Sequence, residues 1–185
     1  TFIGCNKSTS TTEPLSRTEL FMGTVIKISL YDSNDSKILD KAFDRISEIE
    51  SLVSINATGT ELDEVNASAG VKPVNVSSTT YEIVKKGLEY SKLSNGDFDI
   101  TIGPLVKLWS IGLEGAKVPT LEEINTTLPL IDYNLLELNS ENQSIFLKKK
   151  GMVIDLGSIA KGYAADEVAR ILTENNVNSA IIDLG

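Results

Sequence analysis

The sequence contains no histidine, and this absence removes several common kinds of active site from the chain. It excludes a Ser/His/Asp triad, a histidine-ligated zinc ion and the most frequent general base. Chemistry within this chain must therefore use carboxylates, hydroxyls, lysines and main-chain groups. A cation with oxygen ligands, such as Mg²⁺, remains compatible with the composition.

Basic residues are also few, with 17 Lys and Arg against 26 Asp and Glu, which gives a formal net charge of -9. Such a charge repels phosphate backbones, and the basic run Lys148–Lys150 is typical of a solvated turn between strands. A nucleic-acid partner is therefore not expected. No apolar run is long enough to span a membrane, whereas 185 residues suffice for one domain with a real core.

The single cysteine, Cys5, excludes a disulfide within this chain and lies in TFIGCNKSTSTTEP. The chain begins with Thr rather than Met, as if an upstream part were missing, and Gly4 before the cysteine resembles the end of a bacterial lipoprotein signal peptide. Lipidation of Cys5 is favoured over a free thiol in a tail. We expect residues 1–19 to be a signal remnant and flexible tether, and the protein to be lipid-anchored to the cell membrane, facing outside the cytoplasm.

Hydrophobic spacing over residues 20–185 predicts an α+β domain, with a mixed or antiparallel sheet packed against amphipathic helices. The expected strands are 21–31, 98–102, 135–138, 144–148, 152–156 and 180–184. The expected helices are 35–53, 79–93, 121–128 and 159–174, and Thr120 with Glu123 forms a capping box for the third. The polar segment 53–74 is assigned no element, although it is long for a connection.

The stretch DLGSIAKGYAAD, residues 155–166, joins an expected strand to an expected helix through two glycines and a lysine. Such a turn can direct main-chain N–H groups at the helix start toward an anion. The two familiar nucleotide signatures are absent. Tyr163 and Ala164 replace the Lys and Ser/Thr of a Walker loop, and the second glycine of GxGxxG is missing.

A helix terminus alone contributes only about 0.3 to 2 kcal/mol to anion binding, so other groups must converge there. Lys161 is the nearest charge. The structural alternative is that Gly157 only makes a tight turn, Gly162 lets the helix pack closely and Lys161 is solvated. Both interpretations are open on this motif alone.

A second polar cluster lies in GDFDITIGPLVKLW, residues 96–109. The expected strand directs Asp97, Asp99 and Thr101 to one side and the apolar residues between them to the other. Two carboxylates and a hydroxyl would suit sugar or base edges, or a cation. Any edge strand also has one polar face, so the pattern alone does not establish a site.

Four stretches in this order resemble the ApbE family of FAD:protein FMN transferases: FMGT, SINATGTELDEVN, GDFDITIGPLVKLW and DLGSIAKGYAAD. The resemblance runs from about Phe21 to Gly185, and a lipidated export signal is common in the family. It implies an ApbE-like fold, with residues 20–185 as the N-terminal part of the transferase domain. Relatives continue past IIDLG into a half that supplies Asp and Thr metal ligands and a His-containing motif, so we expect a C-terminally truncated chain that is inactive alone.

The resemblance also implies site residues. The positions that fall on FAD contacts are Met22, Asp97, Phe98, Asp99, Asp155 and Lys161. Ser158 falls where the family supplies a Mg²⁺ ligand, often through a main-chain oxygen. Asn56 stands where many relatives place an aromatic residue against the flavin or adenine, so an amide replaces stacking here. No catalytic base or nucleophile is assigned.

The implied reaction is Mg²⁺-dependent transfer of FMN from FAD, the substrate, to a Thr or Ser hydroxyl of another exported protein, with release of AMP. In physical terms it is a phosphoryl transfer, in which Mg²⁺ neutralises the pyrophosphate, and the helix start and Lys161 position it for attack by the hydroxyl. Alternatives are an FAD pyrophosphatase that uses water as acceptor, a non-catalytic flavin-binding surface lipoprotein, and a purely structural tethered domain. The chain has no stretch like a flavinylation acceptor, which argues against its being a flavinylated carrier itself.

Overall fold

The structure is a computed structural model that describes residues 13–55 and 57–185. Cys5 and Asn56 lie outside these residues, so the lipidation site and the replacement of an aromatic by an amide stay predictions. None of the described helices is both long and apolar enough to cross a membrane.

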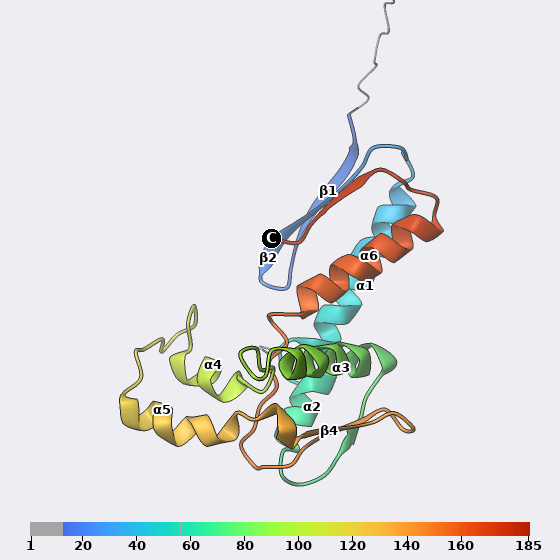
Figure 1. Cartoon of the computed structure of the whole chain (residues 1–185). Coiled ribbons are helices and arrows are strands. Elements are labelled where there is room, and N and C mark those ends of the chain that lie inside the picture. Colours follow the sequence, from blue (N-terminus) through green and yellow to red (C-terminus); the bar gives the residue numbers. More distant parts are fainter. Residues whose placement is uncertain (1–12, 56) are drawn as a thin grey trace, which may run out of the picture.

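Two three-stranded antiparallel sheets organise the described residues (Figure 1). The first has the order β1-β2-β6, formed by Leu15–Phe21, Thr24–Leu30 and Ala180–Asp183. The second has the order β3-β5-β4, formed by Val74–Asn75, Ser144–Leu147 and Leu136–Asn139. These antiparallel sheets together with the helices confirm the predicted α+β class.

Six α-helices accompany the sheets within the described residues. They are α1 Ser36–Val53, α2 Glu61–Ala67, α3 Ser78–Leu93, α4 Gly103–Trp109, α5 Leu121–Thr127 and α6 Ala160–Glu174. In Figure 1, α1 and α6 lie side by side next to the first sheet, and they contact each other along their length. Helices α2 and α3 lie toward the second sheet, and α4 and α5 project to one side.

The long helices form where their apolar residues repeat at helical spacing. On α1 the buried residues are Ile38, Leu39, Ala42, Phe43, Ile46, Ile49 and Val53, and Asp35 caps the first turn by accepting from the Lys37 N–H at 3.0 Å. On α6 the buried residues are Ala160, Ala164, Val168 and Leu172. Ile26 and Ile28 of β2 are fully buried and belong to the same core cluster as these residues, so α1, α6 and the first sheet share one core.

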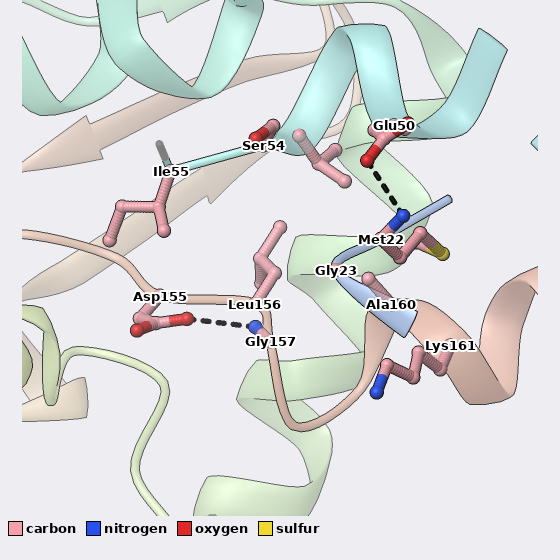
Figure 2. A pocket seen from close by; sticks show the side chains of 11 residues that line it. Met22, Gly23, Glu50, Ser54, Ile55, Asp155, Leu156, Gly157, Ala160 and Lys161 are labelled. Carbon is pink, nitrogen blue, oxygen red and sulfur yellow. Dashed lines mark hydrogen bonds between the residues drawn. The ribbon is translucent and has the colours of Figure 1, made fainter. Parts of the chain in front are cut away.

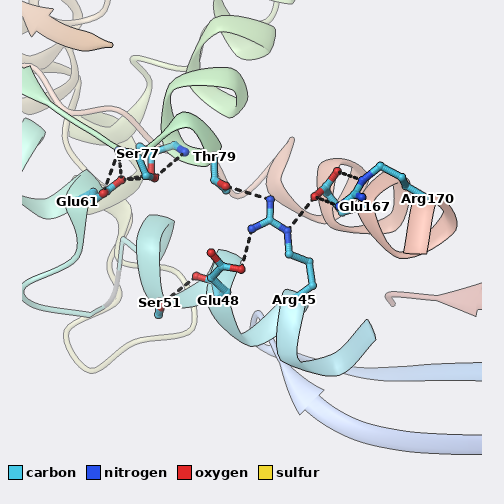
Figure 3. Close-up of polar contacts among 9 residues, drawn as sticks. Arg45, Glu48, Ser51, Glu61, Ser77, Thr79, Glu167 and Arg170 are labelled. Carbon is cyan, nitrogen blue, oxygen red and sulfur yellow. Dashed lines mark hydrogen bonds and ion pairs between the residues drawn. The ribbon is translucent and has the colours of Figure 1, made fainter. Parts of the chain in front are cut away.

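Arg45 ties three helices together at the side of this core (Figure 3). From α1, its Nε donates to Glu167 of α6 at 2.8 Å, and its Nη2 donates to the Thr79 hydroxyl of α3 at 3.0 Å. Arg170 also donates to Glu167. The Arg170 hydrogen bond, with that from Arg45, lowers the pKa of the Glu167 carboxyl below its ordinary value. An ion pair therefore joins α1 to α6, and a hydrogen bond joins α1 to α3.

The first strand begins earlier than the sequence indicates. Residues 15–19 of the expected tether belong to β1, and the expected strand 21–31 is interrupted at Met22 and Gly23. Both of these residues have positive φ, 53° and 71°, and Phe21 pairs with Thr24 across them. This geometry is that of a two-residue hairpin turn of the primed type, so Met22 and Gly23 of FMGT form a turn between the last residue of β1 and the first residue of β2.

The expected strand 98–102 is wrong. Asp99 Oδ1 accepts hydrogen bonds from the Thr101 N–H and hydroxyl, both at 2.8 Å. This local turn competes with extended backbone, and only Ile102 forms an isolated bridge, with Val153. The expected strand 152–156 is wrong as well, because a side chain rather than a strand pairs with its centre. Asn66 accepts from the Ile154 N–H at 2.7 Å and donates to the Ile154 carbonyl at 3.0 Å.

The polar segment 53–74 contains a helix that hydrophobic spacing did not reveal. Helix α2 begins after Thr60, whose hydroxyl accepts from the Asp63 N–H at 3.0 Å. Its buried residues are only Leu62 and Val65, too few to form a visible periodic face over seven residues. The capping box of Thr120 and Glu123 on α5 is confirmed.

Candidate functional site

A cavity of about 330 Å³ opens where the β1–β2 turn, the end of α1 and the loop before α6 meet (Figure 2). It is lined by Met22, Gly23, Glu50, Val53, Ser54, Ile55, Asp155, Leu156, Gly157, Ala160 and Lys161. The volume lies at the lower end of the range for small-molecule pockets. Three residues predicted from the sequence, Met22, Asp155 and Lys161, thus line one cavity although they come from distant segments.

Asp155 is held firmly in place. Its N–H donates to the Ile100 carbonyl at 2.8 Å, and the residue before it, Ile154, is bound on both sides by the Asn66 amide. Oδ1 of Asp155 accepts from the Gly157 N–H at 2.8 Å (Figure 2). The residue is only 9% exposed, and its Oδ2 accepts no hydrogen bond from the described residues. One carboxylate oxygen is therefore fixed by the loop, while the other stays open to a ligand.

Lys161 lies in the first turn of α6 and is half-buried at the cavity. Ile159 is the N-cap of α6, and no side chain in the described part of the chain caps this helix start. The Ala160 N–H donates to the Leu156 carbonyl at 2.8 Å, whereas the N–H groups of Lys161 and Gly162 have no acceptor among the described residues. These two groups carry the positive end of the helix dipole. A lysine ammonium together with an uncapped helix start forms a local environment that favours an anion.

The structural alternative for GSIAKG is only partly supported. Apart from its own helix backbone, a Cβ on Gly162 would meet no atom of the described residues within 4 Å, so close helix packing does not explain this glycine. Gly157 does make a tight turn, because its N–H is bonded to Asp155 and an added Cβ would lie 3.1 Å from Oδ1. Lys161 lines the cavity and is not fully solvated.

The Asp97, Phe98 and Asp99 run lies outside this cavity. Asp97 is exposed. Asp99 is engaged in the fold, since it accepts from Thr101 and, through Oδ2, from the Tyr133 N–H at 3.0 Å. Phe98 and Ser158 instead line a second, mostly apolar hollow with Tyr90, Leu93, Ser94 and Ile159. The expected polar face of a strand is therefore absent, and FAD contacts by these residues stay predictions.

The described residues do not by themselves assemble a metal centre. No group of three or more His, Cys, Asp or Glu side chains in this part of the chain is placed to hold an ion. Ser158 is exposed in the second hollow and does not line the cavity. The open oxygen of Asp155 nevertheless fits the usual Mg²⁺ pattern, in which one or two carboxylates are completed by phosphate oxygens and water.

Glu50 is a cavity residue that sequence reasoning missed. Its Oε1 accepts a hydrogen bond from the Met22 N–H at 2.7 Å. The helical pattern of α1 marks Glu50 only as a residue between the core face and solvent, and its partner is 28 residues away in sequence. No local signal in the sequence could have found this contact.

The chain belongs to the ApbE family, whose model matches residues 22–185. It is 36% identical over 166 residues to the FAD:protein FMN transferase of Klebsiella pneumoniae strain 342, covering 90% of this chain and 52% of that protein. It is 32% identical over 179 residues to the FAD:protein FMN transferase of Treponema pallidum strain Nichols, covering 92% of this chain and 49% of that protein. The chain thus spans about half the length of these relatives.

Solved structures agree with this assignment. The flavin transferase ApbE from Vibrio cholerae superposes with a TM-score of 0.86 at 27% identity, covering 94% of this chain and 57% of that one. The ApbE protein from Thermotoga maritima gives a TM-score of 0.83 at 26% identity, covering 92% of this chain and 56% of that one. The predicted ApbE-like fold is confirmed.

Proposed function

We propose that this chain supplies FAD-binding residues of an FAD:protein FMN transferase. In this reaction FMN passes from FAD to a Thr or Ser hydroxyl of an exported protein, and AMP is released. The observation that carries the proposal is the cavity in which Met22, Asp155 and Lys161 meet. The printed names of the relatives, FAD:protein FMN transferase, support the same activity.

The chemistry is a displacement at phosphorus. The acceptor oxygen bonds to the phosphorus of the FMN half, the bond from that phosphorus to the bridging oxygen breaks, and AMP leaves with that oxygen. The hydroxyl proton is released in the same step. Lys161 and the start of α6 would bind and orient the pyrophosphate, which holds the phosphorus in line for attack.

The charges around the cavity support a divalent cation in this reaction. Two carboxylates, Glu50 and Asp155, line it together with one ammonium, that of Lys161. A pyrophosphate brought there would meet more negative than positive charge unless a cation came with it. When bound, Mg²⁺ neutralises the pyrophosphate and stabilises the charge that develops on the leaving AMP. Asp155 is the cavity residue that would hold the ion, and the main-chain ligand at Ser158 stays a prediction.

The test is to incubate the protein in its full natural length with FAD, Mg²⁺ and a candidate exported acceptor. We expect flavin fluorescence to become covalently attached to the acceptor, with one AMP released for each flavin transferred. Free FMN in place of labelled acceptor would indicate the pyrophosphatase alternative. Intact FAD after incubation with several acceptors would contradict both activities.

We also propose that a lipid on Cys5 anchors the protein to the cell membrane, facing outside the cytoplasm. The support is the sequence around Cys5, with Gly4 before it and a Ser/Thr-rich tract after it. Fractionation of cells should find the natural protein with membranes and a Cys5→Ala variant in the soluble fraction. Identical fractionation of the two proteins would contradict this proposal.

A further inference from the structure

Met22 has a backbone conformation that methionine rarely adopts. Its φ of 53° lies in the left-handed region, which carries a steric cost for any residue with a Cβ. The following residue, Gly23, has a φ of 71° and tolerates it without cost. The pairing of β1 with β2 offsets part of this cost, and a contact from outside the hairpin that holds the Met22 position offsets more of it.

The stabilising contact comes from α1. Phe21 and Thr24 close the hairpin, so the N–H of Met22 lies outside the strand pairing. Glu50 Oε1 accepts this N–H at 2.7 Å, and Glu50 forms no ion pair with any described residue. A hydrogen bond to a carboxylate is about twice as strong as one between neutral groups. Oε1 of Glu50 thus binds the main-chain N–H of Met22 in the turn.

The contact lies in the wall of the candidate site. Both Met22 and Glu50 line the cavity, and Figure 2 shows the hydrogen bond between them beside Gly23 and Ala160. Glu50 follows Ile49, which is fully buried in the core, so the helix that carries the carboxylate is fixed. The strained turn is therefore held against a rigid element at the edge of the cavity.

We propose that Glu50 is a positioning residue that locks the Met22–Gly23 turn and so presents Met22 to the ligand. The role of FAD as that ligand rests on the proposed function, whereas the lock itself is a property of the ligand-free protein. This lock, the hydrogen bond from the Met22 N–H to Glu50, requires an acceptor at the end of the residue 50 side chain. Glu50→Gln keeps an acceptor oxygen, whereas Glu50→Ala removes it.

The experiment compares amide hydrogen exchange at Met22 in the FAD-free full-length protein with FAD affinity measured by calorimetry in the presence of Mg²⁺. In Glu50→Ala we expect Met22 exchange and the FAD dissociation constant each to rise at least about tenfold, the loss of one charge-assisted hydrogen bond. Glu50→Gln keeps a neutral acceptor and therefore a weaker hydrogen bond, so it should recover part of both. Asp44→Ala, which removes an exposed carboxylate from the same helix, is the matched control and should change neither.

The outcomes separate the lock from the proposed function. Unchanged Met22 exchange in a folded Glu50→Ala protein would overturn the lock, and faster exchange with unchanged FAD affinity would overturn its role in the site. If Glu50→Ala does not fold, Glu50→Gln decides: FAD affinity well below that of the natural protein despite protected Met22 would also overturn the role. If the natural protein fails to bind FAD, the proposed function is wrong, while faster Met22 exchange in Glu50→Ala would still support the lock.

Discussion

Replacing Asn66 by alanine should destabilise the protein strongly, because this side chain takes the place of a strand partner for Ile154. The amide accepts from the Ile154 N–H at 2.7 Å and donates to its carbonyl at 3.0 Å, and Ile154 is fully buried. Leaving a buried donor or acceptor unsatisfied costs about 1–3 kcal/mol each. Since water can reach part of the space left by the side chain, we expect a total loss of about 2–4 kcal/mol in the free energy of unfolding.

Urea unfolding followed by circular dichroism measures this loss. Asn125→Ala is the matched control, since Asn125 is exposed on α5, and it should change stability by less than about 0.5 kcal/mol. Asn66→Asp keeps an acceptor for the Ile154 N–H but turns an oxygen toward its carbonyl, so it should cost nearly as much as alanine. If Asn66→Ala is as stable as the control, the pairing of Ile154 by a side chain does not hold the loop before Asp155.

Further predictions concern α6 and a close main-chain contact. The hydrogen bond from Arg170 above all, with that from Arg45, lowers the pKa of Glu167 below its ordinary value of 4.5. The ionised Glu167 therefore stabilises the folded protein fully above pH 4.5, and this contribution is lost as the pH falls through the lower pKa of the folded state. Glu167→Gln should therefore lower the melting temperature more at about pH 7 than at about pH 3, and an equal effect at both would contradict this. Gly103→Ala should destabilise by about 1–3 kcal/mol in urea, because its Cβ would lie 2.6 Å from the Val153 carbonyl oxygen. Gly162→Ala, which meets open space in a helix, should instead stabilise by about 0.5–1 kcal/mol, and a loss would revive the packing explanation for this glycine.

The long helices could be predicted because their buried residues recur at helical spacing along the chain. Helix α1 was expected at 35–53 and is Ser36–Val53, and α6 was expected at 159–174 and is Ala160–Glu174. The alternation of polar and apolar residues predicted strands wrongly where side chains bind the main chain in place of a neighbouring strand. Asp99 folds its own segment into a turn, and Asn66 pairs with Ile154, so two alternating stretches are not strands.

The candidate site was predictable in part. FMGT and DLGSIAKGYAAD were recognised as motifs, and the fold brings their Met22, Asp155 and Lys161 to one cavity. Glu50 could not be predicted, because its role depends on a hydrogen bond from the Met22 N–H, which lies 28 residues earlier in the sequence. Residues whose function rests on a distant main-chain group leave no pattern in the local sequence.

The most direct test of the account is calorimetric titration of the protein with FAD in the presence of Mg²⁺. We predict binding by the natural protein and by Lys72→Ala, which removes an exposed lysine away from the cavity lining. Lys161→Ala should bind at least about tenfold more weakly, since it loses a charged partner of the pyrophosphate. Absence of FAD binding, or equal affinity in Lys161→Ala and Lys72→Ala, would contradict the claim that this cavity binds the pyrophosphate.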